Sequence, residues 1–404
     1  MGRHFIIISA ACIGWVAGQA QASGFRIPEA SITGLGMSNA LVANPLELGA
    51  LPYNPAAMSF HEGTHMMAGL LMIDHAVQVT PAGGTGAADG GGDSAAAIPA
   101  LYATGALTSE WNWGLNISVP FGLSTDWPAN IFPVLSAPST RTAHPAQSRI
   151  DLINLNPNAS YQINTRTIAA FGMDYYHVKK VRLDTHVVPI NGDGSDFGWN
   201  AAVLHVHAPW SFGVSYRSAV TVKVNGTVGT AAATTDLGLP WMLQVGVRYQ
   251  ATDKWGVEFD VERTGWKKFN QIIIDSTASG ATLVTSTNAW DDANAFRLGA
   301  SYDLTAQTQW RAGYSRDLTG QGDAHFSARV PDADRHLFSM GMRHTLPDDW
   351  AVEAAYMYVM FDNRDAAATR PFGTYGGDPN GTTAYNGKYE SSAHLLGVGV
   401  SKKF

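Results

Sequence analysis

From about residue 60 to the end, apolar and polar residues alternate along the chain, and this alternation constrains the fold more than any other feature. Residues 255–262, for example, read Trp-Gly-Val-Glu-Phe-Asp-Val-Glu. A period of two predicts β-strands with one apolar and one polar face. No apolar run reaches the roughly 20 residues that a membrane helix needs. The chain is therefore predicted to be all-β.

The tryptophans and the lengths of the connections predict that the apolar faces point outward, into lipid. Tryptophan follows a short polar turn at several predicted strand starts, namely Trp111, Trp113, Trp210, Trp255, Trp310 and Trp350. Short turns alternate with long connections, at residues 75–97, 121–148, 179–196, 225–238, 266–292, 317–333 and 361–388. Aromatic girdles and alternating short and long connections are typical of outer-membrane barrels, whose long loops lie on the extracellular side. Because lipid leaves no backbone group unpaired, we predict a transmembrane antiparallel β-barrel of about 14 strands over residues 61–404.

Residues 1–22 have the features of a signal peptide. Arg3 supplies the positive start, Phe5–Val16 is apolar, and Ala20-Gln21-Ala22 fits the cleavage rule. The apolar run is too short to anchor the chain in a membrane. The only cysteine, Cys12, lies in this segment, so the mature chain is expected to have no disulfide. An export signal followed by a barrel predicts the outer membrane of a Gram-negative bacterium.

Charge and motif content argue against nucleic-acid binding and catalysis. The formal net charge is −7, and an acidic chain gives no support for a nucleic-acid partner. The glycine-rich residues 81–92 lack the Gly-Lys-Ser/Thr ending of a phosphate loop, and no Gly-x-Ser-x-Gly elbow is present. His205 and His207 share a strand face and could chelate a metal, but a polar lumen or rim position is favoured because no third ligand has a supporting spacing. We expect no cofactor and no enzymatic activity.

Residues 23–60 differ from the rest of the chain. Isolated apolar residues are interrupted by several glycines and by Pro28, Pro45, Pro52 and Pro55. That many breakers exclude a long helix or strand. A half-apolar segment of this length is not expected to remain in water. We predict that it folds inside the barrel as a plug.

Short motifs in this segment and in the barrel carry a resemblance to a known family. They are Ser23-Gly24-Phe25, Gly34-Leu35-Gly36, Asn54-Pro55-Ala56, Phe197-Gly198-Trp199-Asn200-Ala201, Tyr216-Arg217-Ser218, Trp266-x-x-Phe269 and Val330-Pro331-Asp332-Ala333-Asp334-Arg335. In this order they resemble the FadL family of outer-membrane transporters of long-chain fatty acids and other hydrophobic compounds. The resemblance implies that the N-terminal segment is a hatch inside the barrel. It also implies a gating role for Phe25, Asn54, Pro55 and Ala56.

The third predicted strand is interrupted at Pro120, Phe121 and Gly122. Proline cannot donate to the sheet, and glycine permits a sharp bend. The interruption is either an ordinary strand end or a break in the wall, and the resemblance implies a lateral opening through which the ligand leaves. Because a broken strand has unpaired backbone groups that need partners, we hypothesise that Asn54 caps the break in the closed protein.

One predicted external loop is unusually apolar. It contains Trp127, Ile131, Phe132, Val134 and Leu135. An exposed apolar loop is unfavourable unless it packs or binds something. The resemblance implies a surface groove that captures the ligand first, and we expect these residues to form it.

Candidates for binding the head group of a fatty acid are Lys179, Lys180, Arg182 and His186. The resemblance implies basic residues inside the barrel, but residues 285–287, where the family has one of them, read Thr-Ser-Thr here. A long-chain fatty acid is the expected ligand, with a neutral aromatic hydrocarbon as the alternative. A general porin and an outer-membrane lipid hydrolase are less favoured.

The lumen-facing positions of several predicted strands are charged. Glu258, Asp260 and Glu262 follow one strand, and the arginines are Arg217, Arg248, Arg297 and Arg311. They form either an internal lattice of ion pairs or a path for ions, and the lattice is favoured because lumenal charges are cheaper when paired. The expected partners of the protein are a hydrophobic small molecule, the lipids of the outer membrane and, through the terminal aromatic residue Phe404, the barrel assembly machinery.

Overall fold

The computed structural model describes most of the chain after the predicted signal peptide. The described residues are 24–82, 87–90, 95–129, 131–132, 145–186, 188–368, 373–375, 378–379 and 385–404. Residues 1–22 lie outside them, as do Val134 and Leu135. In this part of the chain no helix is long and apolar enough to cross a membrane.

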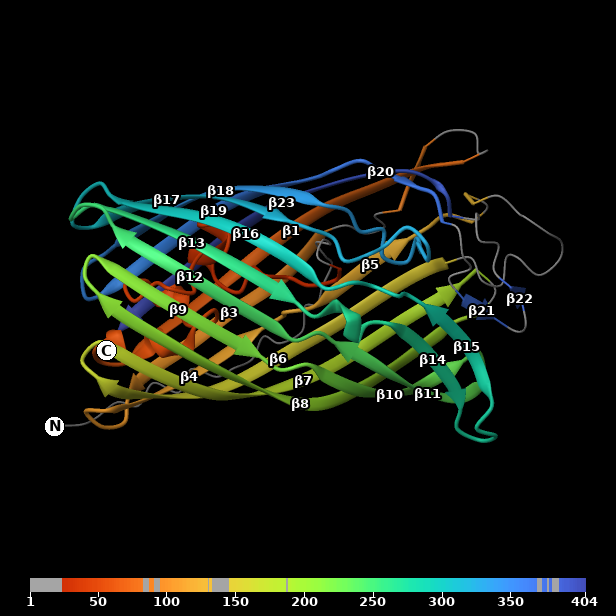
Figure 1. The fold of residues 1–404 in the computed structure, drawn as a ribbon, viewed down its shortest axis with the longest axis horizontal. Coiled ribbons are helices and arrows are strands. Elements are labelled where there is room, and N and C mark those ends of the chain that lie inside the picture. The colour runs from red at the N-terminus through yellow and green to blue at the C-terminus, as the bar shows by residue number, and fades with distance from the viewer. Residues whose placement is uncertain are drawn as a thin grey trace.

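The described strands form a closed antiparallel barrel with 14 strand positions, which we call staves (Figure 1). Several staves are interrupted once and then consist of two successive labelled strands. In chain order the staves are β1 (His65–Pro81), β3 (Ala95–Ala106), β4 (Trp111–Ser118) with β5 (Gly122–Asp126), β6 (Pro145–Asn164), β7 (Thr167–Thr185), β8 (Ile190–His207), β9 (Trp210–Arg217) with β10 (Val220–Val228), β11 (Ala231–Leu239) with β12 (Met242–Gln250), β13 (Trp255–Thr264) with β14 (Gln271–Ser276), β15 (Thr282–Thr287) with β16 (Ala293–Asp303), β17 (Thr308–Asp317), β18 (Arg335–Thr345), β19 (Trp350–Phe361) and β23 (Gly387–Lys403). Short strands lie at one end, namely β2 (Ala88–Asp89), β20 (Arg364–Ala366), β21 (Gly373–Tyr375) and β22 (Asp378–Pro379).

The first and last staves close the barrel. β1 pairs with β23 along its whole length, from His65 opposite Lys403 to Pro81 opposite Gly387. A closed sheet has no free edge, and this is what lets strands cross lipid without unpaired amides. The predicted all-β transmembrane barrel is confirmed.

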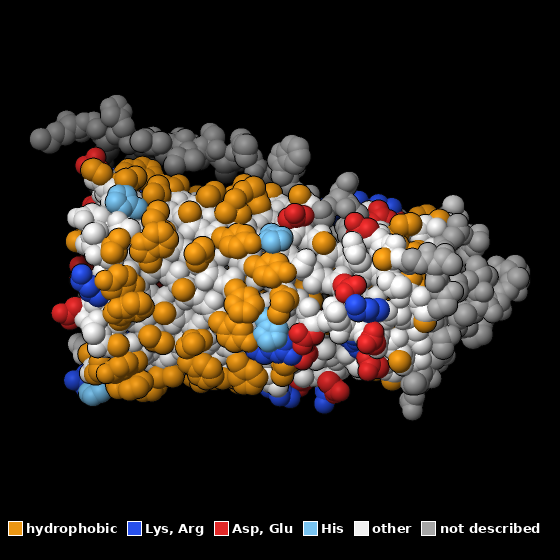
Figure 2. Space-filling model, turned by 90° about the horizontal axis from the view of Figure 1, so that it is seen from above, with side chains coloured by type: hydrophobic (Ala, Val, Ile, Leu, Met, Phe, Trp, Pro, Cys, Tyr) orange, Lys and Arg blue, Asp and Glu red, His pale blue; other side chains and the backbone are white. Residues whose placement is uncertain are grey.

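The alternation of residue types separates the outside of the wall from the inside. On β13, Phe259 is 44% exposed on the outer face, whereas Glu258, Asp260 and Glu262 are buried on the inner face. On the face seen in Figure 2, hydrophobic side chains form a broad band across the barrel, and most charged side chains lie beyond its edges. The band matches the apolar belt of an outer-membrane barrel.

Residues 24–60 lie inside the barrel, where they form the red segment enclosed by the strands in Figure 1. The segment contains one short helix, α1 (Ile32–Gly36), and two 3-10 turns, η1 (Leu48–Ala50) and η2 (Pro55–Phe60). Two neighbouring amides are held by the acidic row of β13: Ala43 N donates to Glu258 Oε1 at 2.6 Å, and Val42 N donates to Asp260 Oδ2 at 3.0 Å.

The remaining lumenal charges are mostly paired with one another. Arg26 of the N-terminal segment and Arg297 of β16 both contact Glu262. Arg297 also pairs with Asp317 at 3.3 Å. On the neighbouring strand β17, Arg311 bridges Glu47 at 2.7 Å and Glu353 at 3.4 Å. Ionic groups removed from water require such partners, and this arrangement is the predicted lattice.

Two of the predicted long loops differ from the expectation of an open external loop. Residues 225–238 are mostly strand, because β10 and β11 continue to a two-residue turn at Gly229, which has a φ of +58°. Residues 318–334 fold into the lumen, as described below. The staves extend well past the lipid, where their outer face needs no apolar residues, so the alternation that revealed them in the belt is lost there.

The orientation of the barrel can be tested by labelling. An epitope inserted between Gly229 and Thr230 should be labelled on intact cells, because long extensions face outward in these barrels. An epitope at Asp253, in the short β12–β13 turn, should be labelled only after permeabilisation. Labelling in the reverse order would contradict this orientation.

Candidate functional site

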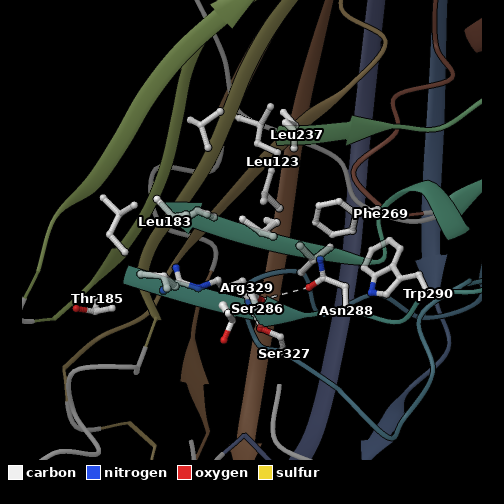
Figure 3. A pocket seen from close by; sticks show the side chains of 18 of the residues that line it. Leu123, Leu183, Thr185, Leu237, Phe269, Ser286, Asn288, Trp290, Ser327 and Arg329 are labelled. Atoms are coloured by element: carbon white, nitrogen blue, oxygen red, sulfur yellow. Dashed lines mark hydrogen bonds between the residues drawn. The ribbon is translucent and has the colours of Figure 1, made fainter. Parts of the chain in front are cut away.

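A largely apolar cavity lies in the half of the barrel away from the C-terminus (Figure 3). It has a volume of about 820 Å³, counting space open to solvent. Its apolar walls are formed by Leu123, Ile150, Val181, Leu183, Ile190, Leu237, Phe269, Ile272, Ile274, Val284, Trp290 and Val330. Mostly apolar walls with a few polar groups are typical of small-molecule sites.

Polar groups gather in one part of this cavity. Arg329 lies beside Ser286 and Ser327 (Figure 3). Among the described residues, its guanidinium donates to the Ser148 hydroxyl at 3.0 Å and to the Asp184 carbonyl at 3.1 Å, not to a carboxylate. Burial lowers the pKa of Arg329 to about 10, so the side chain remains a cation at neutral pH.

Arg329 is placed by the segment Leu318–Asp334 between β17 and β18, which we call the crossing loop. This loop leaves one wall and reaches the opposite one, where Thr125 Oγ1 donates to the Arg329 carbonyl at 3.1 Å. Nearby, Trp127 Nε1 donates to the Ala328 carbonyl at 2.8 Å. The expectation that this segment is an external loop is wrong, and only its tip around Gly322 is exposed.

A cluster of aromatic rings lies between the cavity and Phe121, where the third stave is interrupted. The Phe25 ring centroid lies 5.0 Å from Phe269, which lines the cavity, and 5.9 Å from Phe121. Gly24 has a φ of +68°, and a Cβ there would clash with the rings of Trp266 and Trp290. Only glycine therefore fits before Phe25, which explains the Ser-Gly-Phe motif physically.

The third stave is broken between β4 and β5. In the described pairings β3 contacts β4 as far as Leu101 opposite Ile117, whereas β5 pairs with β6 alone. The N-terminal segment supplies partners at the break: Ile27 N donates to the Pro120 carbonyl at 2.9 Å, and Gly122 N donates to the Phe25 carbonyl at 2.8 Å. The interruption is therefore a break within the wall and not a strand end.

Residues 13–404 match the family described as "Outer membrane protein transport protein (OMPP1/FadL/TodX)". The chain belongs to this family. The FadL-family resemblance, the outer-membrane location and a role in transport are thereby confirmed.

Relatives and solved structures of the FadL family cover nearly all of the chain. The long-chain fatty acid transport protein of Escherichia coli K12 is 23% identical, covering 87% of this chain and 90% of its own. Outer membrane protein P1 of Haemophilus influenzae is 24% identical, with 96% of each chain covered. The fold is shared with a Pseudomonas aeruginosa FadL homologue, at a TM-score of 0.78 and 18% identity over 94% of this chain and all 100% of the other. It is also shared with the Pseudomonas putida toluene transporter TodX, at 0.64 and 16% over 93% and 99%.

The family motif Asn54-Pro55-Ala56 lies away from the strand break. Asn54 Oδ1 accepts from Ala56 N at 3.0 Å, which begins η2 with Pro55 in its first turn. Its Nδ2 donates to the Val42 carbonyl at 2.7 Å and to the Val203 carbonyl on β8 at 3.1 Å. The hypothesis that Asn54 caps the break is wrong, because Phe25 and Ile27 occupy that place.

The apolar loop after β5 was expected to be exposed, but its described aromatic residues are buried. Trp127 is 1% exposed and Phe132 is 2% exposed. Phe132 packs against Tyr385 with ring centroids 4.9 Å apart, and Ile131 is partly buried beside this cluster. The crossing loop gives these side chains an internal surface that the sequence did not reveal. Val134 and Leu135 lie outside the described residues.

None of the four predicted head-group residues lines the cavity. Lys179 and Lys180 lie at a bulge between Val178 and Val181. The bulge shifts the inward-facing positions from even-numbered residues such as Val178 to Val181, Leu183 and Thr185. Arg182 pairs with Asp184 on the same strand, and His186 is exposed. The cation at the cavity is Arg329, and its only sequence signal was a lone arginine within the apolar run Phe326–Val330.

The two histidines considered as metal ligands have separate partners. His205 Nδ1 lies 2.9 Å from Thr167 Oγ1, and His207 Nδ1 lies 3.3 Å from Arg166. Within the described ranges, no group of three or more His, Cys, Asp or Glu side chains could hold a metal ion.

Removing the Asn54 side chain should loosen the N-terminal segment. Asn54→Ala leaves two buried carbonyls without this donor, which costs about 2 kcal/mol of docking free energy. We expect more frequent opening and a higher single-channel conductance in planar bilayers. Asn156→Ala is the control, because its amide bonds only wall residues such as Met173 at 2.7 Å. Equal conductance of Asn54→Ala and Asn156→Ala would contradict the expectation.

Proposed function

We propose that the protein is a passive transporter through which hydrophobic molecules cross the outer membrane. The observation that carries this proposal is an apolar cavity that is separated from a break in the barrel wall by a single layer of aromatic rings. A general porin is disfavoured by the paired charges and the segment that fill the lumen. A hydrolase is disfavoured because the names of the FadL-family relatives describe transport.

A long-chain fatty acid is the proposed ligand. The aliphatic walls suit an acyl chain, and Arg329 with the hydroxyls of Ser286 and Ser327 suits a carboxylate, since charge-assisted hydrogen bonds are the stronger ones. Relatives named long-chain fatty acid transport proteins support this class. The alternative is a neutral aromatic hydrocarbon, favoured by Phe269 and Trp290 in the wall and by the similar fold of toluene transporters.

Capture is proposed to begin at a second apolar cavity of about 290 Å³. It shares Val181, Leu183, Ile190 and Ile274 with the first cavity, and it extends along β8, β10 and β11 toward the exposed strand ends. We assign to this surface the role that was expected of the loop after β5, because Trp127 and Phe132 of that loop are buried.

Release is proposed to occur sideways at the break in the third stave. The route requires Phe25 to leave its place between Phe269 and Phe121, and with it the two backbone hydrogen bonds to Pro120 and Gly122. A ligand drives this change only if it binds better when Phe25 is displaced. The concentration gradient is then sufficient, and no coupled energy source is needed.

The charge at Arg329 can be separated from the apolar walls. Arg329→Gln should weaken the binding of dodecanoate by about ten- to a hundredfold, because a hydrogen bond to a charged group contributes roughly 1.5–3 kcal/mol. Binding of dodecanol should change little. Calorimetry with both compounds measures the difference. Equal losses for both would overturn the carboxylate role, and tight binding of toluene by wild type would favour the aromatic alternative.

Filling the break should slow release. A Cβ at Gly122 would already lie 2.9 Å from Ile27 Cδ1, so Gly122→Trp should occupy the space that the N-terminal segment must vacate. We expect uptake of radiolabelled fatty acid by whole cells to fall severalfold at equal amounts of protein in the outer membrane. Leu107→Trp, at a site 63% exposed in the β3–β4 turn, controls for added bulk. Normal uptake by Gly122→Trp would redirect the route to the periplasmic mouth.

A further inference from the structure

Arg364 of β20 forms several hydrogen bonds to the tip of the crossing loop. Its Nη1 donates to Gln321 Oε1 at 3.0 Å, and its Nη2 donates to the Gln321 carbonyl at 2.8 Å and to Asp323 Oδ1 at 2.7 Å. Nη1 also contacts the carbonyl of Asp332. One guanidinium therefore holds the first and last parts of the same loop.

A ring contact adds to these hydrogen bonds. The Arg364 guanidinium carbon lies 4.9 Å from the centroid of Phe326, which is itself buried against Tyr389 with ring centroids 4.8 Å apart. The Arg364 side chain is only 10% exposed. A cation over an aromatic face gains most where water is excluded. A planar fork with several donors makes this set of contacts, and a lysine ammonium cannot reproduce it.

The loop that Arg364 grips is also a wall of the ligand cavity. Gln321, Ser327, Arg329 and Val330 all line it. Gln321 is central, because its Nε2 donates to the Val330 carbonyl at 2.8 Å while its Oε1 accepts from both Arg364 and the amide of Asp332. Arg364 is therefore connected through Gln321 to the part of the loop that lines the cavity, although Arg364 does not itself line the cavity.

Beyond these contacts the tip of the loop is open. Gly322 and Asp323 are exposed, and a Cβ added at Gly322 would meet nothing within 4 Å. The far end of the loop, by contrast, is fixed by the bonds from Thr125 and Trp127. Just before the tip, Asp291 N donates to the Gly320 carbonyl at 2.8 Å. Residues 321–323 beyond this bond are held to the wall by Arg364, and they can move when the Arg364 contacts are released.

We propose that Arg364 is a positioning residue that latches the crossing loop over the ligand cavity, and that release of this latch lets ligand pass in and out. The inference rests on the proposed function, since it concerns the same cavity. It adds a gate on the extracellular side, separate from the sideways exit at Phe25.

Binding kinetics in nanodiscs distinguish a latch from a wall support. The probe is dodecanoic acid brominated on its acyl chain, which quenches tryptophans that it touches, and Trp290 lines the cavity. Arg364→Gln should raise the association and dissociation rate constants together, by roughly tenfold, because the closed state loses charge-assisted hydrogen bonds. The Kd should change by less than about threefold, since a gate affects both directions equally.

Matched variants make the test specific. Arg263→Gln is the control, because Arg263 bonds Asn294 and Asp292 outside the crossing loop. Arg364→Lys should be intermediate, since it keeps the charge and loses the fork. Asp323→Asn removes one exposed partner of the latch, so it should raise both rates by a smaller factor even if Arg364→Gln assembles poorly.

The outcomes separate the two proposals. Saturable quenching with wild-type rates in Arg364→Gln and Asp323→Asn would overturn the latch and leave the proposed function standing. A faster dissociation alone, with a proportionally weaker Kd, would also overturn it and make Arg364 a support of the cavity wall. Wild-type protein without saturable quenching by the probe would overturn the proposed function itself.

Discussion

Pairing of backbone amides is the constraint on which this structure depends. In lipid no water is available to form a hydrogen bond with an unpaired amide, so the sheet must close on itself. β1 and β23 achieve this over seventeen paired positions, from His65 to Pro81. In the described part of the wall, β5 lacks β3 as a neighbour beyond the break after β4. There the chain brings its own backbone from inside, at Phe25 and Ile27, to complete the pairing. The position of the N-terminal segment is thus tied to the weakness of the wall.

The lumen solves a second problem, which is how to hold a segment in place without making it part of the sheet. Acidic side chains on β13 accept hydrogen bonds from the amides of Val42 and Ala43. Ion pairs link Arg26 and Glu47 to the wall. Buried ion pairs contribute little net stability, because desolvation offsets much of their attraction. Their geometry is specific, however, and removing one partner is costly. The arrangement favours one docked position over many loosely packed ones.

The sequence was sufficient where a short-range physical rule operates. Alternation at a period of two, as on β13, predicted the staves inside the lipid belt. Pro120 and Gly122 marked the interruption of the third strand, although they left open whether it was a strand end or a break in the wall. The sequence was insufficient where the relevant partner is distant. Trp127 was expected to be exposed because nothing local indicated that Ala328 would reach it. Arg329 was missed because its role depends on a loop that folds inward. Residues 225–238 were expected to be a loop, although most of them belong to β10 and β11, because no rule requires alternation outside the lipid.

The contacts of the N-terminal segment also set an order of events. Gly24 N donates to Asp332 Oδ2 at 3.0 Å, across 308 positions of sequence, and Thr33 reaches Glu353 across 320. Neither partner exists until nearly the whole chain has been delivered, and pairs so distant in sequence form late. The part of the protein that is exported first is therefore among the last to acquire its structure. The barrel must be almost complete before it has an interior to fill, and its closure is finished from within.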